Sequence, residues 1–328
     1  MSSIAIIGAG LSGMVLATRL SPKAEVTVFE KSRGYGGRMS TRRMDDFQFD
    51  HGAQYFTAHG AGFQGFLDTL LEAGHVAKWS PRLATLTGNG SAQPLEWNAQ
   101  RYVATPGMNS ICKAMAEGQN IVPQTEVGSI SQEGNKWALQ DAAGTPLGPF
   151  DWVISTAPAD QSARLMPEAF VEGPALAAVQ MQGCYALMVG LAEPQTLDWD
   201  AATVKGAPLG WIAVNATKPG RGTAQTFVCQ STNDWAEDNL ERDQAEVQQI
   251  LLDSFEAVTG IRVVEPAYLG LHRWRYAAVS KPANAPFLLD AGSRLAACGD
   301  WCGAGKIEAA FDSASALVDA LVENHGLG

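Results

Sequence analysis

SIAIIGAGLSGMVLATRL, residues Ser3–Leu20, is a short apolar run followed by three spaced glycines and then by apolar residues at helical spacing. This order predicts a buried strand, a tight turn and an amphipathic helix. In the GxGxxG pattern, Gly8 permits the turn, Gly10 lets the backbone approach a pyrophosphate, and Gly13 lets the helix pack on the strand. The helix amino terminus presents free N–H groups to phosphates, so Ser12 in this loop is also a predicted contact.

A second predicted strand, EVTVFE, ends on Glu30, twenty residues after Gly10. An acid at this place accepts hydrogen bonds from a ribose 2′-hydroxyl and repels a 2′-phosphate. Strand, glycines, helix, strand and acid in this register predict a bound ADP group. Lys31, directly after the acid, is a further predicted cofactor contact.

The stretch EKSRGYGGRMSTRR, Glu30–Arg43, distinguishes between two cofactors. A nicotinamide-binding unit would continue into its next helix, whereas here a basic, glycine-rich loop follows. Gly37 and Arg38 lie in this loop, and the planar guanidinium of an arginine can hold a phosphate oxygen. The loop is suited to wrap a second segment around a pyrophosphate, which favours FAD over NAD.

Composition excludes several classes of protein. The 328 residues are enough for two domains, with 46% apolar and 17% charged residues. A net charge of −11 disfavours nucleic acid as a partner. The apolar run Ile4–Ile7 is too short to span a membrane, and no cleavage site follows it. We therefore expect a cytoplasmic protein whose partners are small molecules; the oligomeric state stays open.

A second glycine-rich stretch, ACGDWCGAG (Ala297–Gly305), raises the question of a thiol or metal centre. Cys298 and Cys302 are spaced like some redox or metal pairs, but the nearest histidine, His325, lies beyond a predicted helix. Five scattered cysteines do not form a disulfide framework. We expect buried thiols and no metal, within a strand, a glycine turn and a final helix.

The acid followed by GGR resembles the flavin-containing amine oxidase superfamily. Within it, FDHGAQYFT (Phe49–Thr57) and LHRWRYA (Leu271–Ala277) are similar to renalase and its bacterial relatives. The resemblance covers nearly the whole chain. It implies an α/β, p-hydroxybenzoate hydroxylase-like flavoprotein of two interleaved domains. A Rossmann-type FAD-binding domain would comprise 1–57, 101–160 and 284–328, and an α+β substrate domain 58–100 and 161–283.

Patterns outside these motifs predict further elements. Apolar spacing indicates helices in Phe63–Gly74, after Asn109 or Ser110, and from Arg242 to Val258. Trp79–Trp97 reads as turn-rich, because Thr, Gly, Asn, Ser and Pro are frequent in it. RLAACGDW, from Arg294, predicts the last strand, and Lys306–Leu321 the last helix.

The resemblance also implies roles for residues far from the first loop. It places Val127 at the adenine, Asp300 at a ribityl hydroxyl, and Gln54 and Tyr55 near the flavin ring. The last helix, with Ile307 in its first turn, would direct its positive end at the flavin N1/C2=O edge. Candidates opposite this cradle are the catalytic residues His272, Tyr276 and Trp211, with Trp301 beside them. Arg273 or Arg275 could meet a substrate phosphate.

Renalase-like enzymes oxidise isomeric 2- or 6-dihydro-NAD(P) to NAD(P)⁺, with hydride transfer to flavin N5 and reduction of O₂ to H₂O₂. Such a transfer needs positioned rings more than a strong protein base. The resemblance therefore implies an oxidase of this kind. The alternative is an amine oxidase, which uses an aromatic cage; a less favoured alternative is a flavin-binding redox sensor without turnover. No cysteine lies where monoamine oxidases carry covalent flavin, so we expect non-covalent FAD.

Overall fold

The first sheet of the molecule is built around the amino-terminal strand. The structure, a computed structural model, describes residues 1–88 and 90–324. Within these residues, six strands form one sheet in the order β19 (Leu288–Asp290), β20 (Leu295–Ala297), β13 (Trp152–Ser155), β1 (Ser3–Ile7), β2 (Glu25–Glu30) and β9 (Ile121–Pro123). Strands β1, β2, β9, β13 and β20 pair in parallel, and β19 pairs antiparallel with β20. Ile4, Ala5 and Ile6 are fully buried because both sheet faces are covered.

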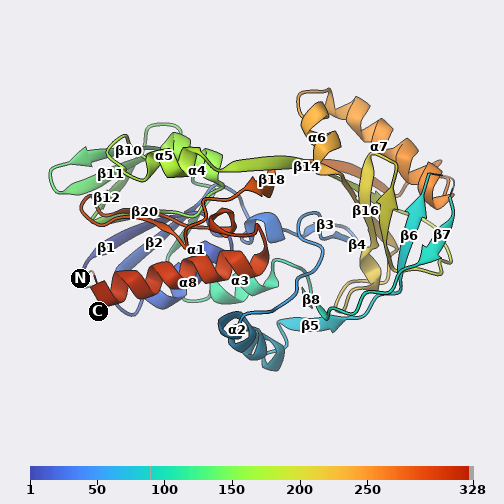
Figure 1. The fold of residues 1–328 in the computed structure, drawn as a ribbon, viewed down its shortest axis with the longest axis horizontal. Coiled ribbons are helices and arrows are strands. Elements are labelled where there is room, and N and C mark those ends of the chain that lie inside the picture. Colours follow the sequence, from blue (N-terminus) through green and yellow to red (C-terminus); the bar gives the residue numbers. More distant parts are fainter. Residues whose placement is uncertain (89, 325–328) are drawn as a thin grey trace.

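Helices cover one face of this sheet and a small sheet covers the other. On one face lie α1 (Leu11–Leu20), α3 (Ser110–Met115) and α8 (Ile307–Asn324), as Figure 1 shows. The other face packs against α4 (Ala159–Leu165), α5 (Gly173–Ala177), and a sheet of β10 (Val127–Glu133), β11 (Lys136–Asp141) and β12 (Pro146–Phe150). The predicted α/β class with a Rossmann-type unit is confirmed.

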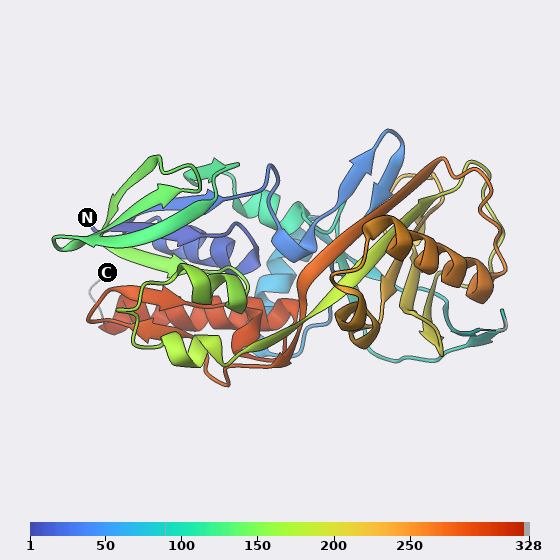
Figure 2. The same ribbon diagram turned by 90° about the horizontal axis from the view of Figure 1, so that it is seen from above.

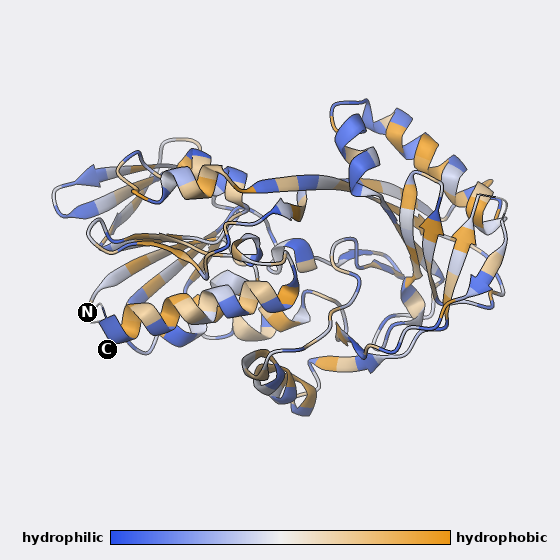
Figure 3. Cartoon of the chain, in the orientation of Figure 1, coloured by the Kyte–Doolittle hydropathy of each residue, from blue (hydrophilic) through white to orange (hydrophobic). Residues whose placement is uncertain are grey.

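A second, seven-stranded sheet forms the other half of the molecule. Among the described residues its order is β18 (Tyr268–Lys281), β14 (Gln180–Gly190), β17 (Thr226–Ser231), β16 (Leu209–Val214), β15 (Ala201–Lys205), β6 (Leu83–Thr87) and β7 (Ala92–Pro94). Helix α7 (Gln244–Thr259) packs on it, and α6 (Asn233–Asn239) lies beside β14. Apolar segments occur on α7 and on the strands near it (Figure 3). Helix α7 begins after Asp243, whose carboxylate caps it, close to the predicted start.

The expectation of a turn-rich segment between Trp79 and Trp97 was wrong. Strands β6 and β7 lie there, and β6 pairs in parallel with β15. Leu83, Ala84 and Leu86 are buried in this pairing. The partner strand lies more than a hundred residues away, so the local excess of turn-forming residues hid a strand that tertiary pairing stabilises.

Two long strands connect the halves of the molecule. Strands β14 and β18 pair from Gln180–Lys281 to Gly190–Tyr268 and run between the two sheets (Figure 2). Smaller elements lie between the sheets: β3 (Arg42–Met44), β4 (Phe47–Phe49), α2 (Ala61–Glu72), β5 (Val76–Trp79), β8 (Arg101–Ala104), and the 3-10 turns Gly37–Met39, Asn215–Thr217 and Asp300–Cys302. The interleaved domain boundaries stay a prediction, and His325 with the rest of 325–328 lies outside the described residues.

A buried ion cluster also links the two halves. Asp50 is fully buried and accepts from Lys218 Nζ at 3.3 Å and from Arg221 Nη2 at 2.6 Å. Thr41 Oγ1 and the Met108 N–H donate to the same carboxylate. Burial lowers the pKa of Lys218 to about 8, so it stays mostly charged at neutral pH. No helix within 1–88 and 90–324 has the length and apolar character needed to cross a bilayer.

Candidate active site

A large cavity lies between the two sheets. It has a volume of about 2420 Å³, and residues of the amino-terminal, central and carboxyl-terminal parts of the chain line it. Pockets for one small ligand measure roughly 300–1,000 Å³. The cavity therefore has room for a dinucleotide and a second ligand.

The glycines of the first loop have two different roles: two are needed for packing, and one faces the cavity. Gly8 has a φ of +106°, and a Cβ on Gly13 would overlap the carbonyl oxygen of Gly8. A Cβ on Gly10 would meet nothing within 4 Å, although Gly10 lines the cavity. Helix α1 begins after Gly10 without a side-chain cap. Gly8 and Gly13 are thus required by the fold, whereas Gly10 leaves space beside unpaired N–H groups.

The basic glycine loop lies against the first loop. The N–H of Gly36 donates to the carbonyl of Ala9 at 2.9 Å, and a Cβ on Gly37 would lie 3.7 Å from Gly10 Cα. The next motif is attached here too, because the N–H of Ala53 donates to the carbonyl of Arg38 at 2.8 Å. Three segments that are separate in sequence, the two glycine loops and the segment that contains Ala53, therefore meet at one end of the cavity.

Glu30 lies at the carboxyl end of β2 and is buried. Its carboxylate accepts from the N–H groups of Ala9 at 2.8 Å and Ser32 at 2.7 Å. A carboxylate has about four acceptor positions, so two stay available for ribose hydroxyls. Val127 is buried at the start of β10 on the cavity wall. Lys31 is exposed, and its ammonium donates to the Gln161 side chain at 3.2 Å.

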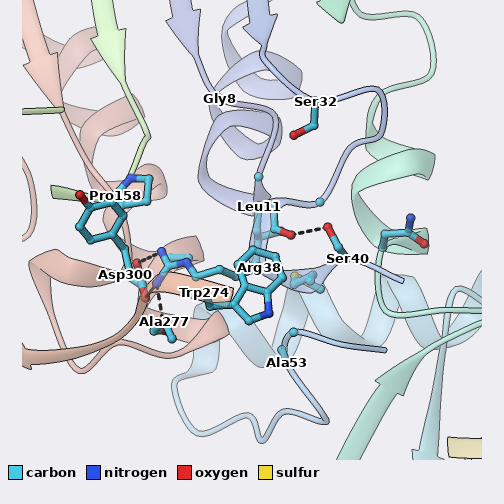
Figure 4. A pocket seen from close by; sticks show the side chains of 18 of the residues that line it. Gly8, Leu11, Ser32, Arg38, Ser40, Ala53, Pro158, Trp274, Ala277 and Asp300 are labelled. Carbon is cyan, nitrogen blue, oxygen red and sulfur yellow. Dashed lines mark hydrogen bonds and ion pairs between the residues drawn. The ribbon is translucent and has the colours of Figure 1, made fainter. Parts of the chain in front are cut away.

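Arg38 and Asp300 bind each other. Two guanidinium nitrogens donate to the two carboxylate oxygens at 2.8 and 2.5 Å (Figure 4). Arg38 also approaches the carbonyl of Ala277 on β18 at 3.4 Å. The expected partners of these side chains, a phosphate and a ribityl hydroxyl, stay predictions; the ion pair brings both groups to the same wall.

The start of α8 completes this end of the cavity. Ile307, its first residue, lines the cavity, whereas the Ser12 hydroxyl donates to the carbonyl of Ala310 at 2.8 Å and thereby joins α1 to α8. Glu308 accepts from the N–H groups of His59 and Gly60, which precede α2. The Ser12 hydroxyl therefore connects two helices, in addition to its predicted contact with the cofactor.

The opposite wall carries a histidine pair. The His272 ring lies 4.9 Å from that of His51 and 4.2 Å from that of Trp274, and the Trp274 indole donates to the carbonyl of His51 at 2.8 Å. Burial, helped by the charge of Arg42, lowers the pKa of His272 to about 4. Burial and the neighbouring His272 lower the pKa of His51 likewise to about 4. Both imidazoles are therefore neutral at pH 7.

Sequence reasoning missed His51, although it lies in the quoted segment Phe49–Thr57. The signal was a second histidine beside a glycine turn, but its pairing with His272 spans more than two hundred residues. In the structure its Nδ1 is buried and has no hydrogen-bond partner among the described residues. The pair, not His272 alone, forms this part of the wall.

Aromatic side chains form a neighbouring surface. Tyr55, Trp97 and Trp211 line the cavity, with the Tyr55 ring 5.7 Å from Trp211 and 6.3 Å from Trp97. The guanidinium of buried Arg101 lies 4.3 Å from the centre of the Trp97 ring and packs against it in a cation–π contact. Gln54 also lines the cavity, but its side-chain amide bonds to Asp50 O, Gly52 O and Lys218 Nζ.

Three other predicted residues, Tyr276, Arg273 and Arg275, line the cavity and also have protein partners. The Tyr276 hydroxyl accepts from Arg164 of α4 at 2.8 Å, so its phenol is held at the nucleotide-binding side. Trp301 is wholly buried in the core, and its indole donates to Ala157 O, so of the two possibilities, core packing and a place at the flavin face, the structure shows core packing. Arg273 donates to Leu240 O, and Arg275 pairs with Glu241. Both arginines bind the segment between α6 and α7, and their contact with a substrate phosphate stays a prediction.

The cysteines are buried thiols. All five are free, and burial raises the pKa of Cys302 to about 11 and that of Cys298 well above its usual range. A thiol needs its thiolate form to react or to bind metal. Burial therefore disfavours the thiolate form of Cys298 and Cys302.

The charge of the cavity is opposite to that of the chain. Among the described residues that line it, four are acidic (Glu30, Glu126, Asp300, Glu308) and ten are basic (Lys31, Arg33, Arg38, Arg42, Arg43, Lys113, Arg164, Arg273, Arg275, Lys306). The whole chain has 34 acidic and 23 basic residues. Even without Arg273 and Arg275, basic residues outnumber acidic ones two to one, so the cavity attracts anions.

The residues present fit a dinucleotide cofactor. Gly10 leaves space where a Cβ would intrude, beside the uncapped end of α1. Asn109 Oδ1 lines the same region, buried and without a donor among the described residues. Free N–H groups, an unpaired acceptor and spare carboxylate positions are what phosphates and hydroxyls require.

Two family models, a relative and several solved structures match this chain. The profile described as NAD(P)-binding Rossmann-like domain matches residues 6–70, and that of Flavin containing amine oxidoreductase matches residues 65–316. Renalase from Mus musculus is 24% identical over 309 residues, 87% of each chain. Cyclohexylamine oxidase from Brevibacterium oxydans (TM-score 0.74, 13% identity) covers 98% of this chain and 100% of its own. An oxidoreductase from Methanosarcina mazei (TM-score 0.73, 15% identity) covers 97% and 100%. These structures share the fold.

Proposed function

The chain belongs to the flavin-containing amine oxidoreductase family, and from that premise we propose that it oxidises isomeric 2- or 6-dihydro-NAD(P). The reaction is dihydro-NAD(P) plus O₂ and a proton to NAD(P)⁺ and H₂O₂. Bound FAD would supply the hydride acceptor and pass the electrons to O₂. Similarity to renalase over most of the chain supports this choice within the family.

The chain's own residues would hold the cofactor at the glycine loops. The uncapped end of α1 and the guanidinium of Arg38 would face the pyrophosphate, Glu30 a ribose, and Asp300 a ribityl hydroxyl. Val127, Gly37 and Ile307 line the same part of the cavity. Non-covalent binding of FAD is part of the proposal, because all five cysteines are buried and burial raises the pKa of each thiol.

The charge of the cavity is the observation that carries the choice of substrate. Amine substrates are cations at neutral pH, whereas dihydronicotinamide nucleotides carry phosphates. The lining has ten basic and four acidic residues, and the basic residues at the glycine loops, Arg38 among them, would face the pyrophosphate of FAD. Arg42 also lines the cavity, and its charge acts on His51 and His272, so it favours a phosphate-bearing donor at that wall.

The aromatic residues argue against an amine cage. A group held between two parallel rings needs about 7 Å between them, twice the roughly 3.5 Å contact distance of carbon atoms. Tyr55 and Trp211 lie 5.7 Å apart and are tilted by 49°, and Trp301 is in the core. These side chains offer a stacking surface for one ring and no slot between two.

The neutral histidines suit a reaction without a protein base. The nitrogen lone pair of a dihydronicotinamide expels the hydride, so the protein has to orient the ring and exclude water. His272 lines the cavity, and its uncharged ring can bond a carboxamide without placing a positive charge beside the hydride donor. We assign His272 to orientation, and Trp211 with Tyr55 to stacking.

Anaerobic mixing with three kinds of donor tests the proposal. The FAD-loaded protein is mixed with 6-dihydro-NAD, with ordinary NADH and with a panel of amines, and flavin absorbance is followed. We expect rapid bleaching with the isomer alone. Bleaching by amines alone would replace the proposal with amine oxidation, and bleaching by none of them would favour a sensor without turnover.

A further inference from the structure

We propose that Arg42 binds a phosphate of the reduced substrate and so selects nucleotides over unphosphorylated dihydronicotinamides; this inference rests on the proposed function. Arg42 begins β3, is half-buried and lines the cavity. Its guanidinium donates from Nη1 to the Tyr268 hydroxyl at 3.3 Å, the one side-chain hydrogen bond that it forms among the described residues. None of the ion pairs among residues 1–88 and 90–324 includes it.

Two other arginines of the cavity have carboxylate partners, whereas Arg42 forms no ion pair among the described residues: Arg38 pairs with Asp300, and Arg275 with Glu241. Arg33, Arg43 and Arg164 also form no ion pair there, but Arg42 is the arginine whose charge acts on His272. A half-buried guanidinium has lost part of its hydration, and a neutral phenol does not replace a counter-ion. An anionic ligand in the cavity would supply the missing partner.

The position of Arg42 separates its ligand from the cofactor's own phosphates. The separation between Arg38 and Arg42 can be measured along strand β18, because Arg38 contacts the carbonyl of Ala277 and Arg42 contacts the hydroxyl of Tyr268. The Tyr268 hydroxyl lies beside Gly270, so about seven residues of strand, roughly 23 Å, separate the two contacts. His272 lies between these two points on β18, on the cavity wall. Arg42 therefore lies beyond His272 when viewed from the pyrophosphate loops, at the substrate end.

Arg42 is the charged residue that acts on both histidines of the cavity wall, while the charge of Asp50 acts on His51. Both imidazoles are neutral at pH 7. The planar guanidinium can form two parallel hydrogen bonds to phosphate oxygens, which an ammonium group cannot. The ligand class is thus a phosphate or pyrophosphate several ångströms from the ring that His272 orients.

The experiment compares two donors that differ in phosphate. Arg42→Gln and Arg42→Lys are assayed with 6-dihydro-NAD and with 6-dihydronicotinamide riboside. Hydrogen bonds to a charged group contribute enough for Arg42→Gln to raise KM for the dinucleotide roughly 10- to 100-fold. We expect kcat to be maintained, the riboside to change less than about twofold, and Arg42→Lys to recover part of the loss. Arg262→Gln, an equal change of net charge at an exposed site, is the control.

A binding measurement keeps this inference separable from the proposed reaction. Calorimetric titration of FAD-loaded protein with inorganic pyrophosphate should show weaker binding to Arg42→Gln than to wild type or Arg262→Gln. Equal pyrophosphate affinities, or equal losses with dinucleotide and riboside, would overturn the assignment of Arg42. If neither donor reduces the wild type, the proposed reaction fails, and the titration still decides the anion site.

Discussion

His51 and His272 have lowered pKa values of about 4, chiefly because they are buried. In the unfolded chain a histidine titrates near 6.5. Between pH 6.5 and 4 the unfolded chain thus binds more protons than the folded one, so the free energy of unfolding decreases as pH falls through this window. We expect urea unfolding to show this decrease, and the double variant His51→Asn/His272→Asn to reduce it. The exposed His59→Asn variant should retain the wild-type slope; the same slope in all three would contradict the prediction.

Asp300 anchors both a predicted ribityl contact and the guanidinium of Arg38. Asp300→Ala should lower FAD retention after dialysis, because it removes an acceptor and frees Arg38 from its position. The ratio of flavin to protein absorbance measures this. Asp319→Ala, which removes the exposed partner of Arg19, should retain FAD like the wild type. Unchanged FAD content in Asp300→Ala would remove its assigned role.

Single residues were predictable where backbone geometry requires a residue type. Gly8, Gly13 and Glu30 follow from one local pattern, and the structure places them at one end of the cavity. The Arg38–Asp300 pair joins residues 262 apart, and the His51–His272 contact joins residues more than two hundred apart. No local spacing encodes such contacts. The place of Trp301 was not predictable, because an indole beside a glycine turn suits a core as well as a cavity.

At the scale of one element, the first strand–turn–helix makes two glycine variants behave differently. Gly13→Ala would force a Cβ onto the carbonyl of Gly8, so we expect a large loss of stability together with loss of FAD. Gly10→Ala meets no protein atom within 4 Å, so it should fold normally and bind FAD weakly. Thermal unfolding of the apoproteins and FAD titration separate the two effects. Equal thermal stability of both variants would show that α1 tolerates displacement.

Elements with strong internal periodicity were predictable, and paired elements were less so. Helices α7 and α8 lie close to their predicted bounds because apolar residues recur along one face. Strand β6 was missed because its stability comes from β15, whose sequence lies far away. The five residues of β6 alternate only weakly, and glycine, serine and proline nearby indicated turns.

For the whole molecule, the cluster of Asp50, Lys218 and Arg221 predicts how the halves depend on each other. Asp50→Ala leaves two buried cations without their carboxylate, which should lower the free energy of unfolding by about 3–5 kcal/mol. Urea denaturation measures the change. Asp319→Ala, an exposed pair, should cost about 0–1 kcal/mol. A similar small loss for Asp50→Ala would mean that water reaches the cluster.

The interleaving of two sheets came from resemblance and not from local pattern. The segments that meet at the cavity lie far apart in the sequence, and only the glycine loops contain a local pattern that predicts a ligand. The reversal of charge between cavity and chain was also hidden, because basic residues are scattered along the sequence.

Strands β14 and β18 run from one sheet to the other, and their pairing shifts register between Gln180 and Met181 and again between Gln182 and Cys184. At the second shift, residues 275–277 of β18 lie opposite Gly183 alone. A bulge of this kind bends and twists a strand pair, so it contributes to the angle at which the two halves face each other. The width of the space between the two reacting rings then depends on a few backbone positions far from either ring.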